Sequence, residues 1–295
     1  MKRKLVKQAG QAVTITLPIE WIRKNNLKPG DEIDVDSNDN DLIIRSGKKI
    51  KGDNVKLDFE GFSKRLCYIY LNAAYAKGVD EIELSNANDI SGSLIQNMGF
   101  AVVEQNNNIQ KIKDISGVSS ENLDVIFKRV FQMIISYYDV AINDIFGERV
   151  ATHDDLRNRD IEINKFVLFL ERSIIKSSHP LPLDGKILFA YSFSLEQIGD
   201  EVFRFWRQAL NNKINKSKKV EEIIHISKKA LEKSFEVYYH SDDKPVKDLM
   251  DLKRNIRNKF DCLKIDLVSA RFCMHAVKIV ELCTDLIQLA LMKKL

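Results

Sequence analysis

The chain has 295 residues, of which 44% are hydrophobic and 30% are charged, and its net charge is +4. At roughly 150 residues per domain this length predicts about two domains, and the apolar share excludes a chain that is disordered throughout. The longest stretch without a charge, residues 90–103, is shorter than the roughly 20 residues that span a bilayer, so we expect no membrane insertion. Four widely spaced cysteines, and a basic start that does not lead into an apolar run, predict a cytoplasmic protein without a signal peptide.

Positive charge is concentrated at the start of the chain. Residues 1–30 hold seven bases and one acid, which exceeds the net charge of the whole protein. Such a segment on an otherwise balanced chain indicates an anionic partner at that end. A solvated basic arm would give the same count, so the pattern of the elements has to decide between the two.

Residues 1–46 predict a compact β module. Val13, Ile15 and Leu17 alternate with threonines, as in a half-buried strand, and Pro18 ends the run. The elements expected after it are a helix at 19–26, a turn at 28–31 and strands at 32–36 and 42–44. A module this short, with so few apolar side chains, cannot close a core alone and should need a partner chain.

Residues 47–118 predict a small mixed α/β unit without recognisable chemistry. Apolar side chains at helical spacing from Phe62 to Ala73 predict a helix that Gly78 ends. The further elements expected are a strand at 79–84, a short helix at 90–97 and strands at 100–103 and 109–115. We expect this unit to act as a structural spacer.

Residues 119–295 predict an all-helical part. The helices expected run from the capping segment Ser119-Ser120-Glu121-Asn122 to Phe146, and over residues 154–177, 183–209, 220–239, 246–262 and 264–292. Three long helices followed by three more suggest an internal repeat.

A long ordered string of motifs distinguishes the first module. It runs as Lys4-Leu5-Val6-Lys7, Gly10, Val13-Thr14-Ile15-Thr16-Leu17-Pro18, Trp21-Ile22, Leu27-Lys28-Pro29-Gly30-Asp31-Glu32-Ile33 and Leu42-Ile43-Ile44. Over about residues 3–45 this string resembles the SpoVT/AbrB-like swapped-hairpin domain. The resemblance implies an intertwined dimeric β-barrel that binds DNA, although some members of that superfamily bind protein partners instead.

The same resemblance implies a set of DNA contacts, namely the bases Arg3, Lys4, Lys7, Arg23 and Lys24. Lysine and arginine at these places would bind phosphates, release counterions and set the register on the duplex without reading much sequence. Gln11 is the candidate for contact with a base edge.

Two pairs of carboxylates lie four residues apart, Glu196 with Asp200 and Glu281 with Asp285. This spacing is common by chance in a chain with 42 acids, but residues 272–292 hold no other acid and are apolar almost all round. We therefore expect that helix to be buried and its two carboxylates to need compensation. A cation bound by both carboxylates would provide it, and so would a lysine or arginine from a neighbouring helix.

The two pairs are 85 residues apart (281 − 196), each in the last helix of a predicted three-helix set. With the string Leu195-Glu196-Gln197-Ile198-Gly199-Asp200, this arrangement resembles the PhoU family over about residues 120–292. The resemblance implies that the acidic motifs bind metal, with Fe, Zn, Mn and Mg as candidates for oxygen ligands. It adds Asp160 to the candidate ligands, through the segment Arg159-Asp160-Ile161-Glu162-Ile163-Asn164, in which Asn164 replaces the usual Asp.

The predicted fold class is mixed: an N-terminal swapped-hairpin β-barrel, a small α/β unit and an all-α bundle of two three-helix repeats. This architecture resembles archaeal-type phosphate uptake regulators, which implies a cytoplasmic homodimeric transcriptional regulator that binds DNA and is linked to phosphate transporter components. The alternative is a PhoU-type adaptor that inhibits a phosphate transporter or signalling partner by protein contact, its N-terminal module serving only for dimerisation. We expect no enzyme, because no distinct base or nucleophile accompanies the carboxylates that could hold a water-activating metal.

Overall fold

The computed structural model describes residues 2–8, 10, 13–38, 41–46, 54–87, 95, 98–106, 108–115, 123–148, 151–177, 183–240 and 243–294. The chain divides into two compact units, Met1–Asp53 and Asn54–Leu295. In the described residues, no helix is long and apolar enough to cross a membrane.

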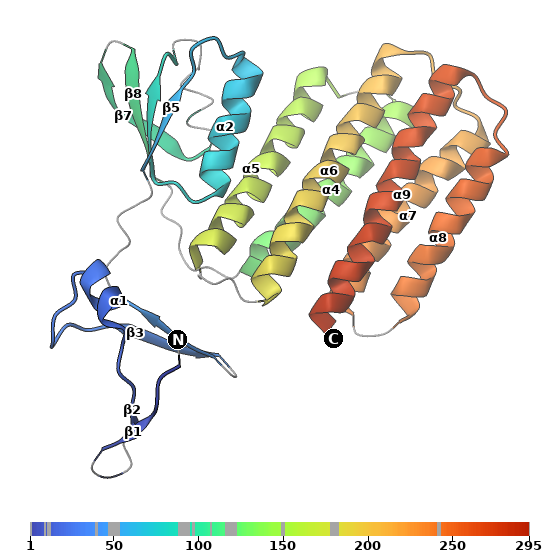
Figure 1. Ribbon diagram of the computed structural model, residues 1–295. Helices are drawn as coiled ribbons and strands as arrows, with labels where there is room; N and C mark the ends of the chain where they lie inside the picture. Colours follow the sequence, from blue (N-terminus) through green and yellow to red (C-terminus); the bar gives the residue numbers. More distant parts are fainter. Residues whose placement is uncertain are drawn as a thin grey trace. The chain divides into compact units, whose positions relative to one another are not determined.

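The first unit consists of two hairpins and a short helix. β1 (Val6–Lys7) pairs antiparallel with β2 (Val13–Thr14), and β3 (Asp34–Asn38) pairs antiparallel with β4 (Asp41–Arg45). α1 (Ile19–Lys24) lies between them and begins after Pro18. The expected turn follows α1: the Asp31 amide donates to the Lys28 carbonyl, and Gly30 takes a φ of 96°, which favours glycine. These elements are drawn in blue in Figure 1.

The predicted β-barrel is not closed within one chain. The two hairpins form separate two-stranded sheets, and the second half of the expected strand 13–17 pairs with no strand of the described residues. Among the described apolar side chains of this unit, only Leu27 is buried. An antiparallel strand region without its own core is what the sequence predicts for a module that depends on a partner.

The second unit opens with a four-stranded sheet covered by one helix (Figure 1). The sheet order is β5 (Asn54–Asp58), β6 (Glu81–Ser85), β8 (Ile109–Asp114), β7 (Phe100–Asn106), with β5 and β6 parallel and the other pairs antiparallel. α2 (Lys64–Ala76) connects β5 to β6, and Gly78 follows it at a φ of 88°. The sheet and α2 enclose a core of their own around Leu71, Ile82 and Phe100.

The sequence pattern predicted α2, β6, β7 and β8 but not β5. Most of the short helix expected at 90–97 lies outside the described residues.

The rest of the chain forms a helical bundle with the elements expected. They are α4 (Leu123–Phe146), α5 (His153–Ser177), α6 (Leu183–Asn211), α7 (Lys218–Tyr239), α8 (Lys244–Asp261) and α9 (Leu267–Lys294). The predicted spans are confirmed to within a few residues at the described ends, whereas the capping segment 119–122 lies outside the described residues.

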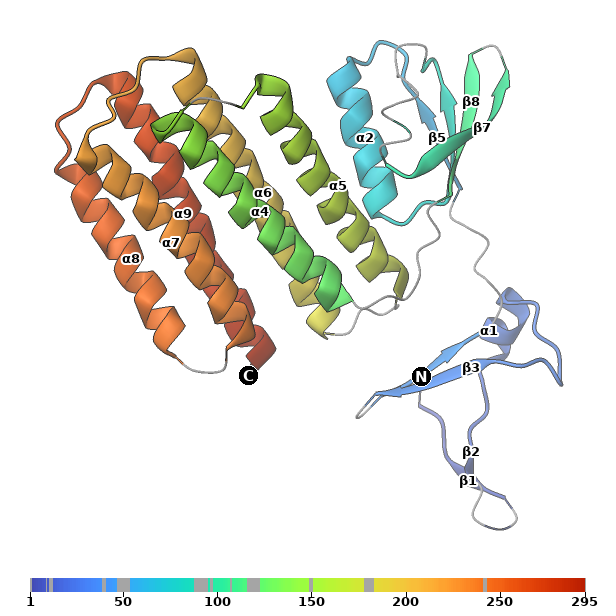
Figure 2. The ribbon, with the colours of Figure 1, turned by 180° about the vertical axis from the view of Figure 1, so that it is seen from behind.

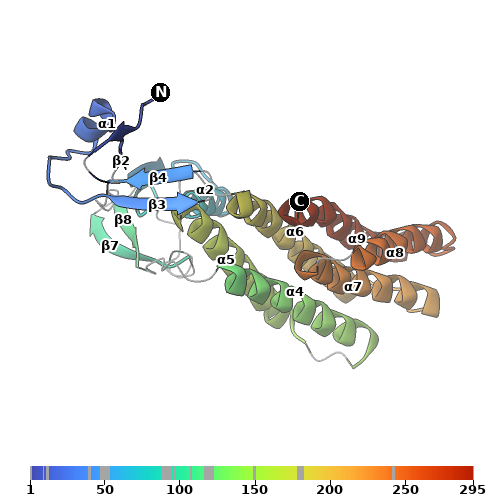
Figure 3. The same ribbon diagram turned by 90° about the horizontal axis from the view of Figure 1, so that it is seen from below.

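The bundle is built from two sets of three helices joined along one seam. α4, α5 and α6 pack on one another, and α7, α8 and α9 do the same. α6 lies beside α9 in Figures 1, 2 and 3, and this pair forms the main contact between the sets. One continuous apolar core runs through all six helices, with Trp206 among its fully buried side chains. That the two sets are an internal repeat stays a prediction.

A buried arginine joins the sheet to the bundle, and Lys176 of α5 forms a further ion pair with Asp80 there. Arg172 of α5 is fully buried and donates to the Tyr75 and Val79 carbonyls at 2.9 Å each. It also donates to Asp80 at 2.9 Å and to Asp114 at 2.7 Å, and its guanidinium lies over the Tyr75 ring. The sheet and the bundle therefore have separate cores but belong to one unit. The division into domains at residues 46 and 118 stays a prediction.

Candidate functional site

The bases predicted to contact DNA are exposed on the first unit. Arg3, Lys4 and Lys7 lie before or in β1, and Arg23 and Lys24 form the last turn of α1. None of the five takes part in an ion pair with another residue that the structure describes. Exposed cations of this kind are what binding to phosphates requires. Gln11 lies outside the described residues.

Large apolar side chains of the same unit are also exposed. Seven of them, 44% to 72% exposed, come from both hairpins and the start of α1: Leu5, Val6, Val13, Ile15, Ile19, Val35 and Leu42. Scattered exposed apolar side chains are normal on a protein surface. A unit in which Leu27 is the only described apolar side chain that is buried, however, has too small a core to be stable by itself. The exposed set therefore marks a surface that needs a partner.

In the bundle, the structure brings three of the five candidate metal ligands near one another. Asp160 extends from α5, and Glu196 and Asp200 from α6. Burial raises the pKa of Glu196 to about 7, and the charges of Asp200 and Asp160 add to this rise. Burial and then the charge of Asp200 raise the pKa of Asp160 to about 6. Carboxyl groups that share a poorly hydrated interior in this way hold their protons well above the usual range.

Polar atoms around these acids lack partners. The Tyr137 hydroxyl, Asp160 Oδ1 and Asn164 Oδ1 are buried, and none forms a hydrogen bond in the part of the chain that the structure describes. Burial, followed by the charges of Asp160 and Asp200, raises the pKa of Tyr137, so the phenol keeps its proton. Asp200 is compensated, because Arg204 Nη2 donates to its Oδ2 at 2.5 Å.

These observations test whether a cation fits the first motif. The unpartnered groups are all oxygen donors, which suit a hard cation. As the side chains stand, however, no group of three or more His, Cys, Asp or Glu among the described residues is arranged so that it could hold a metal ion. The donor chemistry would suit a hard cation held by Asp160 and Glu196, whereas the arrangement of the described side chains does not form a site for one.

The second motif lies in different surroundings. Glu281 accepts a hydrogen bond from Arg257 of α8 at 2.7 Å, and Asp285 is exposed. Lys253 of α8 donates to Thr284 at 2.9 Å, between the two acids. The expectation that these carboxylates are buried is therefore wrong, and the arginine alternative is present at Glu281. A metal role for Glu281 and Asp285 stays a prediction.

An ion cluster around one buried acid, beside the first motif, was not found from the sequence. The side chain of Glu201 on α6 is only 2% exposed and accepts from Arg204 at 2.6 Å, His275 at 2.6 Å and Lys278 at 2.7 Å. Burial alone would raise the pKa of Glu201, but hydrogen bonds from His275, Lys278 and Arg204 outweigh it and hold the pKa at about 2. The cluster binds α6 to α9. Lys278, the only base between Phe272 and Met292, was the available clue.

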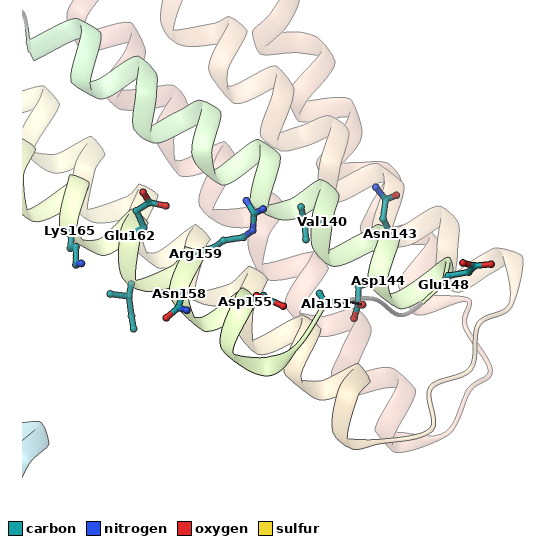
Figure 4. A pocket seen from close by; sticks show the side chains of 11 residues that line it. Val140, Asn143, Asp144, Glu148, Ala151, Asp155, Asn158, Arg159, Glu162 and Lys165 are labelled. Atoms are coloured by element: carbon teal, nitrogen blue, oxygen red, sulfur yellow. Dashed lines mark hydrogen bonds between the residues drawn. The ribbon is translucent and has the colours of Figure 1, made fainter. Parts of the chain in front are cut away.

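The outer side of α4 and α5 carries an open polar groove of about 900 Å³ (Figure 4). Arg159 and Glu162 line it, whereas Asp160, between them in sequence, does not. Asp144 at its inner end accepts from the Trp206 ring nitrogen at 2.7 Å and from the Ala151 amide at 2.9 Å. This buried acid therefore holds α6 and the start of α5 to α4, and the groove is separate from the first motif.

Comparison with protein families matches residues 6–52 to the family described as antidote-toxin recognition MazE, bacterial antitoxin. The match covers most of the first unit and does not extend into the sheet or the bundle. No curated protein matches the chain, and no solved structure matches it. The resemblance of the N-terminus to a swapped-hairpin module is thus supported, whereas the resemblance of the bundle to PhoU rests on the sequence motifs alone.

Proposed function

We propose that this protein is a DNA-binding regulator whose N-terminal unit is completed by a second copy of the chain. The observation that carries the proposal is the match of residues 6–52 to MazE, which is consistent with a DNA-binding or antitoxin-type regulator. The exposed bases and the exposed apolar side chains on that unit support it from the structure.

The two kinds of exposed side chain have separate tasks in this proposal. The apolar ones from β1 to β4 pack against the same side chains of the second copy, so that two incomplete hairpin pairs share one core. The bases Arg3, Lys4, Lys7, Arg23 and Lys24 are then present twice and bind the phosphates of a duplex. Phosphate contacts position the protein, and contacts to base edges supply sequence preference.

A finer proposal concerns what the bundle contributes. Two three-helix sets, each with its acid pair on the last helix, support a PhoU-like bundle that links the regulator to phosphate uptake. The description of the matched family favours a second candidate, an antitoxin-type regulator whose N-terminal unit recognises a protein partner. The adaptor hypothesis, in which this unit only dimerises, differs from the DNA-binding regulator in predicting no duplex binding.

A duplex-binding assay with the purified full chain tests the proposal. Binding to DNA upstream of its own gene and of phosphate-transport genes should weaken steeply with salt, with a log–log slope of about 0.9 for each phosphate contact. Replacing Arg23 and Lys24 by Ala should lower the slope and the affinity for every sequence, whereas replacing the exposed bases Lys128 and Arg129 of α4 should change neither. If no duplex is bound at low salt, the protein is not a DNA-binding regulator.

The metal role of the first motif is a further part of the proposal. A hard cation bound by Asp160 and Glu196 would neutralise carboxylates that burial otherwise keeps protonated, and it would satisfy the unpartnered oxygens beside them. Changing Asp160 to Asn together with Glu196 to Gln should remove metal from the purified protein in elemental analysis. The metal content of the matched double variant, Glu281 to Gln with Asp285 to Asn, shows whether the second motif binds metal. Protein that contains no metal after growth with added Fe, Zn, Mn and Mg would contradict this role.

A further inference from the structure

A cavity of about 590 Å³ lies between α2 on one side and α5 and α6 on the other. Its walls are mostly apolar and include Tyr68 of α2, Leu168 of α5 and Phe203 of α6, together with Met98 before β7. A second apolar cavity of about 250 Å³ shares Met98 and Leu168 with it and continues the space along α5. Cavities that bind small molecules have this volume and this apolar character.

The rim of the cavity is strongly basic. Lys64 and Arg65 of α2, Arg157 of α5 and Arg207 of α6 all line it, against a single acid, Asp160. Neither the Lys64 nor the Arg65 side chain forms a hydrogen bond or an ion pair with any residue that the structure describes. A rim with free lysine and arginine and one acid selects a ligand with a negative group, and guanidinium groups suit phosphate in particular.

The position of Lys64 and Arg65 strengthens this argument. They occupy the first turn of α2, directly after the cap Ser63, and that turn contains no acid. Backbone amides make a helix N-terminus positive, so bases are unfavourable there and acids are preferred. A bound anion beside this turn would offset both the bases and the helix terminus.

We propose that this cavity binds a nucleotide, with its phosphates on Lys64, Arg65 and Arg157 and its aromatic base against the Tyr68 ring. The basic rim accounts for the phosphates, and the aromatic walls account for a flat ring, which inorganic phosphate would leave unused. Such a ligand contacts α2, α5 and α6 at once and therefore joins the sheet to the bundle. The site goes beyond the DNA-binding role and does not depend on it, because ligand binding is measured without DNA.

Calorimetric titration of the full chain with ATP, ADP and AMP, alongside adenosine and inorganic phosphate, tests the proposal. At least one nucleotide should bind more tightly than adenosine and than phosphate, and it should raise the melting temperature. Changing Arg65 and Arg157 to Ala should weaken nucleotide binding on the order of tenfold for each guanidinium lost. Changing Tyr68 to Leu keeps an apolar side chain but removes the aromatic ring. It should weaken the binding of nucleotides and leave the binding of inorganic phosphate unchanged.

The matched control is Arg271 of α9, an exposed arginine outside the cavity, whose change to Ala should leave nucleotide binding unchanged. Circular dichroism of each variant separates lost binding from lost folding. The proposal is overturned if no nucleotide binds at millimolar concentration, or if the Arg65/Arg157 variant binds as well as the wild type. Binding of inorganic phosphate as tightly as a nucleotide would also overturn the proposal. So would binding of dodecanoate, a fatty acid that combines an apolar chain with one negative group, by a protein that binds no nucleotide.

Discussion

Glu171 shows how a single buried group makes stability depend on pH. It lies on α5 and is 7% exposed, and Ser192 of α6 donates to it at 3.2 Å. Burial raises its pKa from 4.5 to about 6, and the bond from Ser192 opposes that rise. The folded protein therefore holds the Glu171 proton more tightly than the unfolded chain does. The resulting stabilisation is complete below the unfolded pKa and is lost as the pH rises through about 6.

The change Glu171→Gln tests this argument, since an amide can still accept from Ser192 but cannot ionise. The variant should melt at a higher temperature than the wild type above about pH 7, and the difference should shrink toward about pH 4.5. Thermal unfolding followed by circular dichroism in the presence of chelator measures it. Glu148→Gln, at an exposed glutamate, is the control and should show no such trend. A gap between variant and wild type that stays constant across this range would contradict the buried-carboxyl argument.

The charged residues that matter in the bundle were only partly predictable from the sequence. The spacing of Glu196 and Asp200 identified the acids on α6, and the PhoU resemblance added Asp160. Glu171 and Glu201 were missed, because burial of a single acid depends on which helices surround it. Neither spacing nor composition contains that information.

At the scale of elements, helix spans were predictable because a long apolar periodicity identifies a helix without knowledge of its neighbours. Strand β5 was not, because only Val55 and Leu57 are apolar in it and its pairing partner, β6, comes after a whole helix. Local pattern cannot reveal a pairing that distant sequence supplies.

The exposure of α9 explains the wrong expectation for the second motif. One stripe of this helix, at spacings of three and four, is exposed or half-buried: Met274, Lys278, Glu281, Asp285, Gln288 and Met292. Because two methionines belong to that stripe, the helix looks apolar all round in sequence although one side of it faces solvent. The carboxylates lie on that side.

The contact of α5 with the sheet gives a prediction at this scale. Arg172 is enclosed by two backbone carbonyls and by Asp80 and Asp114, and the Asp114 side chain is only 6% exposed. The change Arg172→Met keeps much of the length but removes the hydrogen bonds from Arg172 to the two carbonyls and to Asp114, whereas Asp80 keeps its ion pair with Lys176. We expect the free energy of unfolding to fall by about 3–5 kcal/mol, because removing one partner leaves buried charge uncompensated.

Denaturant unfolding of the full chain measures this loss. Arg271→Ala, at an exposed arginine of α9, is the control and should change stability by about 0.5 kcal/mol or less. If Arg172→Met costs no more than the control, the buried hydrogen bonds of Arg172 do not hold α5 to the sheet.

At the scale of the molecule, the first unit is the part whose structure a single chain leaves incomplete. The sequence predicted both its elements and its need for a partner, since about 46 residues with few apolar side chains cannot enclose a core. The closed barrel could not be confirmed from one chain, because closure would use strands of the second copy. The side chains that should form the shared core are therefore exposed in the chain by itself.

This exposure makes the dimer testable by substitutions that a monomer would tolerate. Ile15 is 44% exposed and Leu42 is 59% exposed in the single chain, so changing both to Lys should be nearly neutral if no partner covers them. If a second copy covers them, two buried and unpaired lysines per chain should dissociate the dimer and shift it to a monomer in light scattering at micromolar concentration. The affinity for duplex DNA should fall when the dimer dissociates, and charge cannot explain that fall, because added lysines attract phosphates.

Val125→Lys on α4, at a valine that is 61% exposed, is the matched control and should leave assembly and DNA binding unchanged. A variant that keeps both the dimer and its affinity for DNA would mean that these hairpins do not form the shared core.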